Sequence, residues 1–200
     1  MQFEKGVFGL AIPLHGNWKE GYAIDLHTLY STYLGEDEYG REQFDNHRSP
    51  IGQMLYDFKY RNDYSALKGI MDIVEPFLDS WGIRNNVEAV IAVPSSIIDR
   101  KYQPVFEIAN NIADYLSVPC YNKMLWKTSH NQMKSLAQGD RDLSGQIELQ
   151  SQLDTATNVL LVDDLFRSGT TLNECCRVLK TDPNVDDIYV LTITKTRSNR

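Results

Sequence analysis

Apolar residues along the chain alternate between two spacings. Short continuous apolar runs are typical of buried strands, and apolar positions that recur about every three to four residues predict amphipathic helices. The runs predict strands at 87–93, 118–126, 159–162 and 188–193, and the periodic stretches predict helices at 49–60, 67–81, 105–116 and 171–180. Because strands and helices alternate, we expect an α/β fold with a mainly parallel sheet flanked by helices.

The first 48 residues follow a different pattern. Apolar and polar residues alternate over 22–29, which predicts one or two antiparallel strands. Residues 35–46 are polar and are expected to form a loop. Ser49-Pro50 then has the form of a helix start, with a serine cap and proline in the first turn. We therefore divide the chain into a small β-containing appendage, 1–48, and a main domain, 49–200.

Composition limits the classes of partner. The chain has 200 residues, of which 42% are hydrophobic, and a net charge of −7, which argues against a broad nucleic-acid-binding face. Its three cysteines show no zinc-binding spacing. Because their number is odd and they form no disulfide framework, we expect a reducing environment. No apolar run reaches the roughly 18 residues of a membrane span, and no signal peptide is evident at the N-terminus. A cytoplasmic protein without a membrane partner is expected.

The segment 159–172, Val-Leu-Leu-Val-Asp-Asp-Leu-Phe-Arg-Ser-Gly-Thr-Thr-Leu, carries the clearest chemistry. Two acids, Asp163 and Asp164, stand where the apolar strand is expected to end. The polar loop 167–171 follows, and then a helix begins. Backbone N–H groups of such a loop and helix N-terminus suit a phosphate, and ionised carboxylates are strong acceptors for sugar hydroxyls. Together they indicate a sugar-phosphate site.

Other readings of this segment remain open. An apolar strand that ends in two acids also occurs in P-loop ATPases, but the chain has no Gly-x-x-x-x-Gly-Lys-Ser/Thr loop. Phospho-acceptor receiver domains would need several further βα units, and little chain follows Thr171. A strand and helix with merely solvated acids is the non-functional alternative.

The pattern at 159–171 resembles the phosphoribosyl-pyrophosphate (PRPP) motif of type I phosphoribosyltransferases. In that family the two acids bind the ribose hydroxyls and the loop binds the 5′-phosphate. The resemblance assigns the ribose to Asp163 and Asp164, which also count as catalytic residues. It assigns the 5′-phosphate to Arg167, Ser168, Gly169, Thr170 and Thr171.

The loop after the 87–93 strand is similar to one in the competence-protein ComF family, a branch of these enzymes. That family carries Pro-Val-Pro and then Arg-Gly-Phe-Asn, where this chain has Ala92-Val93-Pro94 and Arg100-Lys101-Tyr102-Gln103. The resemblance makes Arg100 catalytic and assigns pyrophosphate binding to Ser95, Ser96, Arg100 and Lys101. Lys101 replaces a glycine, which would have allowed close approach of the backbone to a ligand.

The same family has a mobile catalytic loop with Gln-x-x-x-Leu followed by Arg. Gln132 to Leu136 and then Arg141 fit this pattern, although Ser144 stands where the family has Asn. The resemblance implies a loop that closes over pyrophosphate. Its candidate residues are Lys127, His130, Gln132, Lys134 and Arg141. Many ComF-like proteins begin with a cysteine zinc ribbon, which this chain lacks.

The resemblance implies that the protein binds Mg²⁺ with PRPP and transfers the phosphoribosyl group to a nitrogenous acceptor. The magnesium would be held through the PRPP oxygens rather than directly by the protein. A homodimer is also compatible with the family. Arg167 stands where hypoxanthine-type enzymes place an Asp base, and an arginine cannot take up a proton there. The alternative is a PRPP- or nucleotide-binding regulatory or partner-binding module without turnover, related to ComF-type DNA-uptake proteins. A structural role for residues 1–48 is a third possibility.

Overall fold

A six-stranded sheet forms the centre of the computed structural model, which describes residues 11–95, 103–127 and 146–197. The strand order is β1-β2-β10-β9-β5-β6, and all neighbours are parallel except β1 and β2. The strands are β1 (Ile12–Pro13), β2 (Glu20–Leu26), β5 (Ala89–Ala92), β6 (Cys120–Tyr121), β9 (Thr157–Phe166) and β10 (Val185–Lys195). The expected α/β architecture with a mainly parallel sheet is confirmed.

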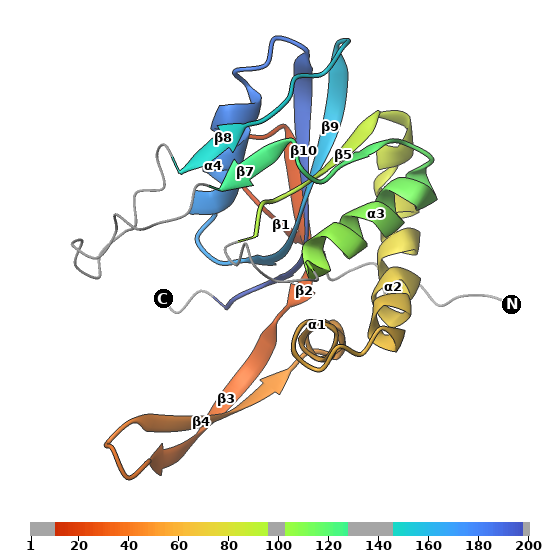
Figure 1. The fold of residues 1–200 in the computed structure, drawn as a ribbon. Helices are drawn as coiled ribbons and strands as arrows, with labels where there is room; N and C mark the ends of the chain where they lie inside the picture. Colours follow the sequence, from red (N-terminus) through yellow and green to blue (C-terminus); the bar gives the residue numbers. More distant parts are fainter. Residues whose placement is uncertain (1–10, 96–102, 128–145, 198–200) are drawn as a thin grey trace, which may run out of the picture.

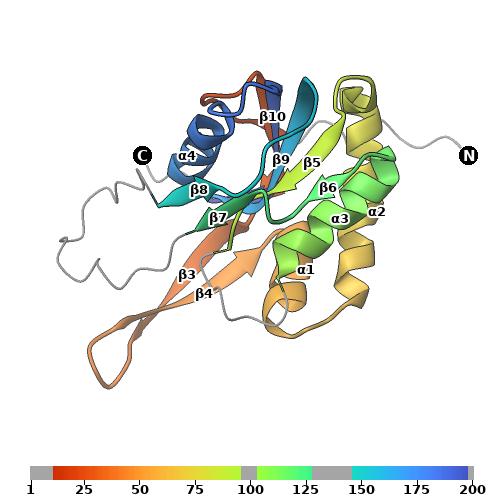
Figure 2. The same cartoon turned by 45° about the horizontal axis from the view of Figure 1, so that its top comes forward.

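Helices cover both faces of this sheet (Figures 1 and 2). One face packs against α1 (Pro50–Tyr60), α2 (Ser65–Trp81) and α3 (Pro104–Leu116). The other packs against α4 (Thr170–Leu179) and a small hairpin of β7 (Leu125–Lys127) and β8 (Ile147–Leu149). Buried central strands contribute to both cores, because successive side chains point to opposite faces. Val159 and Leu161 join one core, and Leu160 and Val162 the other.

The helices begin and end as the sequence predicts, within a few residues. The Ser49 side chain caps α1 by accepting a hydrogen bond of 3.0 Å from the Gly52 N–H. Gly82 ends α2 in a left-handed conformation, φ +71°, which glycine adopts without steric cost. A short 3-10 helix (Ile83–Asn85) follows, and α3 starts at Pro104. The segment 118–126 does not form one strand, since it divides into β6 and the start of β7.

The first 48 residues contain β strands, but their arrangement differs from the expectation. The loop predicted at 35–46 is wrong. β3 (Thr28–Glu36) and β4 (Glu42–Arg48) form an antiparallel hairpin whose connection occupies 37–41. Most side chains of β4 are exposed, so the strand consists largely of polar residues and has no apolar pattern that would predict it from the sequence. The hairpin projects from the body of the molecule (Figure 1).

The strand β2 belongs to the central sheet. It pairs in parallel with β10 and antiparallel with β1, and Ala23 and Ile24 are buried in the two cores. The boundary of the central sheet therefore does not coincide with residue 48. Among the described residues, no helix is both long and apolar enough to cross a membrane.

Candidate functional site

Asp163 and Asp164 lie inside β9 and not after its end. The sequence pattern places the strand end at Val162, and this expectation is wrong because β9 continues to Phe166. Its two neighbours differ in length. Pairing with β5 ends at Ala92 opposite Val162, whereas pairing with β10 runs on to Lys195 opposite Phe166. The two acids thus stay in a regular strand with one side open.

The open side is a cleft of about 280 Å³. It brings together residues that are far apart in the sequence, at the carboxyl edge of the parallel strands, where ligands of open α/β sheets bind. Its lining comprises Lys59, Tyr60, Val93, Pro94, Ser95, Gln103, Pro104, Val105, Asp163, Asp164, Leu165, Arg167 and Thr171. Five of the residues proposed from the sequence, Ser95, Asp163, Asp164, Arg167 and Thr171, therefore share one cavity.

Asp164 forms an ion pair with Lys59. The Lys59 Nζ lies 2.6 Å from Asp164 Oδ2, and the two side chains are 18% and 19% exposed. Sequence reasoning did not include Lys59 in the site. The available signal was the segment 55–60, Leu-Tyr-Asp-Phe-Lys-Tyr, in which the lysine stands between two aromatic residues. Nothing local shows that its lysine reaches a strand 105 residues further along the chain.

Asp163 is poorly suited to carrying a negative charge. Burial, followed by the adjacent charge of Asp164, raises its pKa to about 7, while a hydrogen bond from the Asp164 backbone N–H and the charges of Lys59 and Lys127 act in the opposite direction. The Asp164 N–H donates to Asp163 Oδ1 at 2.8 Å. Near neutral pH the Asp163 carboxyl is therefore partly protonated. The Asp164 carboxylate forms the ion pair with the Lys59 ammonium.

The loop after β9 has the form of an anion-binding turn. Gly169 precedes the first residue of α4 and has φ +79°, a conformation that favours glycine. The hydroxyl oxygens of Ser168 and Thr170 are 2.8 Å apart, and the side chains of both residues are exposed. The N-terminus of the ten-residue helix α4 thus presents backbone N–H groups beside two hydroxyls.

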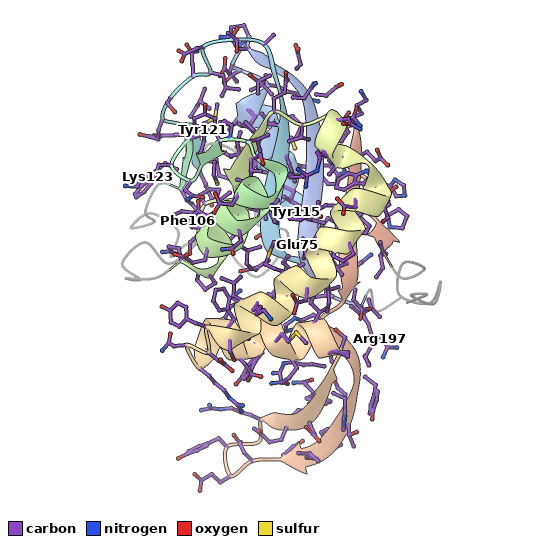
Figure 3. The ribbon with its side chains drawn as sticks, turned by 90° about the vertical axis from the view of Figure 1, so that its right-hand side faces the viewer. Glu75, Phe106, Tyr115, Tyr121, Lys123 and Arg197 are labelled. Atoms are coloured by element: carbon purple, nitrogen blue, oxygen red, sulfur yellow. The ribbon has the colours of Figure 1, made fainter. Side chains whose placement is uncertain are left out.

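Two residues of the other predicted loops are described, Ser95 and Lys127. Ser95 lines the acid cleft and also a second cleft of about 300 Å³, which Lys127 lines at the end of β7. Phe106 of α3 and Lys123 also line this second cleft and are labelled in Figure 3. The remaining predicted residues, Ser96, Arg100, Lys101, His130, Gln132, Lys134 and Arg141, lie outside the described residues.

His27 is a further polar group near the acids that sequence reasoning did not assign. It directly follows β2, and its Nδ1 lies 3.2 Å from Thr194 Oγ1, which in turn donates to the Asp164 carbonyl at 3.2 Å. The Thr194 hydroxyl thus connects the imidazole to the backbone of the acid strand. Burial, followed by the charges of Arg48 and Lys59, lowers the pKa of His27. A neutral imidazole is therefore linked to the acid strand through Thr194 of β10.

Comparison with known proteins finds similar folds among solved structures, while no protein-family model and no curated protein sequence matches the chain. Adenine phosphoribosyltransferase from Saccharomyces cerevisiae is 11% identical, with 84% of this chain and 85% of that chain covered and a TM-score of 0.48. Orotate phosphoribosyltransferase from Aeropyrum pernix is 16% identical, with 82% and 75% covered and a TM-score of 0.45. A hypoxanthine phosphoribosyltransferase from Staphylococcus aureus is 13% identical, with 67% of each chain covered and a TM-score of 0.46. These three solved structures are phosphoribosyltransferases, and the resemblance of this chain to ComF proteins stays a prediction.

Proposed function

We propose that this protein binds Mg²⁺–PRPP in the acid cleft and transfers its phosphoribosyl group to a nitrogen nucleophile, with release of pyrophosphate. The observation that supports this most directly is the geometry at the end of β9. Asp163 and Asp164 line the same cavity as Arg167 and Thr171 of the loop that leads into α4. A sugar with a neighbouring phosphate needs such a combination of acceptors for hydroxyls and donors for an anion.

In the proposed reaction the bond between the anomeric carbon and the pyrophosphate oxygen breaks, and pyrophosphate leaves with the electron pair. A carbon–nitrogen bond forms with the acceptor, whose N–H proton passes to solvent. Positive charge grows on the ribose ring during such a substitution, as in glycoside cleavage. The carboxylates of Asp163 and Asp164 would orient the ribose and stabilise this charge. Arg167 supplies positive charge in the cleft and not a proton acceptor.

In the proposal, magnesium enters the site together with the ligand. Within the described ranges, no group of three or more His, Cys, Asp or Glu side chains is placed to hold a metal ion. Mg²⁺ commonly keeps several waters and binds through substrate phosphates rather than through a protein cage. In the proposal the ion neutralises the departing pyrophosphate, and the protein residues position the sugar.

Isothermal titration calorimetry with Mg²⁺–PRPP tests the binding step. We expect the double substitution Asp163→Asn with Asp164→Asn to abolish measurable binding, because amides do not replace the charge and the acceptor oxygens of the acid pair. A matched control is Asp186→Asn with Asp187→Asn, since these adjacent acids lie near the start of β10, far along the strand from its carboxyl end. Equal affinity of the wild type and the Asp163/Asp164 variant would refute the assignment.

The second candidate function is a PRPP- or nucleotide-binding module without turnover, with regulation or a protein partnership as its output. It is favoured by one observation: Arg167 lines the cleft where a proton acceptor would serve a hypoxanthine-type reaction. Pyrophosphate release from PRPP, measured with a panel of purine and pyrimidine bases and simple amines, separates the two functions. Release with any acceptor supports the transferase, and tight PRPP binding without release across the panel supports the module.

A further inference from the structure

We propose that Lys59 is the third member of the clamp that holds the sugar diol, together with Asp163 and Asp164. This inference rests on the proposed function, since it takes a vicinal diol as the ligand of the acid pair. It extends that function to a side chain of a different element, helix α1, which lies on one face of the sheet (Figure 2).

The position of Lys59 is fixed by the packing of α1. The preceding residue, Phe58, is fully buried, and Leu55 one turn earlier is 1% exposed. These side chains anchor the helix to the sheet, so Lys59 in its last turn is held at the mouth of the cleft. Its Nζ contacts Asp164 at 2.6 Å from a location that is largely shielded from solvent. Such a pair is less screened by water and salt than an exposed one.

The chemistry of an ammonium group suits the recognition of hydroxyls beside carboxylates. The ammonium has three N–H donors, and a hydroxyl can donate one hydrogen bond while it accepts others. A ribose hydroxyl could thus donate to Asp164 and accept from Lys59 at the same time. A carboxylate alone could accept the hydrogen bond that the hydroxyl donates, but it has no N–H or O–H to donate to the hydroxyl oxygen.

Lys59 also counteracts the repulsion between the two acids. Asp163 and Asp164 are consecutive in β9, and the charge of Asp164 disfavours ionisation of Asp163. Other groups act electrostatically on the pair from the elements around it: Lys127 of β7, His27 after β2, Cys175 of α4, and Arg167 of the loop, which lines the same cleft. Lys59 differs from these because its hydrogen bond to Asp164 is direct. The inferred role is therefore to keep acceptors charged and in place for the diol.

A first test needs no ligand. Carbon-13 NMR of the aspartate carboxyl groups in the full chain measures the apparent pKa values of the Asp163–Asp164 pair. In Lys59→Met we expect the higher of these values to rise by about one unit or more, because a cation that favours ionisation is lost. Lys68→Met is the matched control, since Lys68 is exposed on α2, and it should titrate as the wild type does. An unchanged titration in Lys59→Met would overturn the inference.

A second test measures Mg²⁺–PRPP affinity by calorimetry at pH 7 and pH 9. We expect Lys59→Met to weaken binding about tenfold or more at pH 7 and to recover part of that loss at pH 9, where the acids ionise without help. Lys59→Arg keeps the positive charge and should bind within about threefold of the wild type. Circular dichroism and urea unfolding show whether each variant is folded. A loss that is equal at both pH values and that arginine does not rescue would indicate a merely structural lysine and overturn the inference.

The two proposals fail in different ways. If the wild type does not bind PRPP, the proposed function is refuted, and the NMR titration still decides whether Lys59 sets the charge of the acid pair. If the wild type binds PRPP and Lys59→Met binds it equally well at both pH values, the proposed function stands and Lys59 is not part of the clamp.

Discussion

Ser49 and Leu26 are 23 residues apart in the chain and are joined by a hydrogen bond of 2.5 Å, from Ser49 Oγ to the Leu26 carbonyl. The same hydroxyl oxygen accepts from the Gly52 N–H at the start of α1. One fully buried side chain thus caps a helix and ties it to the end of β2. The start of α1 also lies close to the chain after β2, since a Cβ atom on Gly52 would lie 2.3 Å from the His27 carbonyl oxygen.

We expect Ser49→Ala to lower the free energy of unfolding by about 1–3 kcal/mol, because a helix cap is lost and the Leu26 carbonyl loses its partner. Urea unfolding followed by circular dichroism measures this. Ser151→Ala, at an exposed position, should change stability little. A Ser49→Ala variant as stable as the wild type would show that the interaction contributes nothing.

Stability should depend on pH through Asp163. Its pKa is about 7 in the folded protein against an ordinary value of 3.8, so the folded state holds a proton that the unfolded state has released. The contribution of this proton to the free energy of unfolding is fully present below about pH 4 and is lost as the pH rises to about 7. Asp163→Asn cannot ionise, so it avoids this loss of stability and should be about 1–2 kcal/mol more stable than the wild type at pH 8. This gain is smaller than the full pKa shift of Asp163 implies, because the side chain is partly exposed.

Urea unfolding of Asp163→Asn between pH 4 and pH 8 checks this expectation. Asp186→Asn, an exposed acid, serves as the comparison and should follow the wild-type profile. The linkage would be disproved if the advantage of Asp163→Asn over the wild type were the same at pH 4 and pH 8.

Gly169→Ala should destabilise the loop that precedes α4. Gly169 has φ +79°, and a Cβ atom there would lie 3.1 Å from two ring atoms of Phe166. Gly82 has a similar φ of +71° with nothing within 4 Å, so Gly82→Ala isolates the backbone cost of about 1 kcal/mol. We expect Gly169→Ala to lose more than Gly82→Ala in urea unfolding and to weaken PRPP binding as well. Equal losses would mean that Phe166 moves aside freely.

The two parts of the first 48 residues should differ in their importance for folding. Deletion of 1–48 removes β2, leaves one edge of β10 unpaired and uncovers both cores, so we expect an aggregating or unfolded product. Replacement of 32–45 by Asn-Gly keeps the paired residues Ser31 and Asn46 and supplies a hairpin turn. This shortened variant should remain monodisperse in size-exclusion chromatography and unfold cooperatively. A stable, soluble protein without 1–48 would contradict the role of β2.

The hairpin also shows where local patterns mislead. Residues 42–48 are polar, and a sequence reading based on burial predicts a loop there. Their side chains are mostly exposed because the hairpin stands away from the core, with Arg197 donating to the Leu29 carbonyl near its base at 2.6 Å (Figure 3). A strand that buries neither face leaves no alternation in the sequence. Local patterns also mislead at the end of β9. The two acids suggested that the strand ends at Val162, whereas its pairing with β10 continues to Phe166.

The helices, the buried strands, the α/β class and the acid pair with its glycine-containing loop can all be predicted from local patterns in the sequence. These features depend on residues that are neighbours along the chain, so periodicity and caps are enough to reveal them. Three other features emerge only from the fold: β2 joins the central sheet, Lys59 reaches Asp164, and His27 contacts Thr194 of β10, the strand next to β9. Those contacts join segments that lie far apart in the chain, and they arise from the packing of α1 and β2 against β9 and β10, which no local pattern encodes.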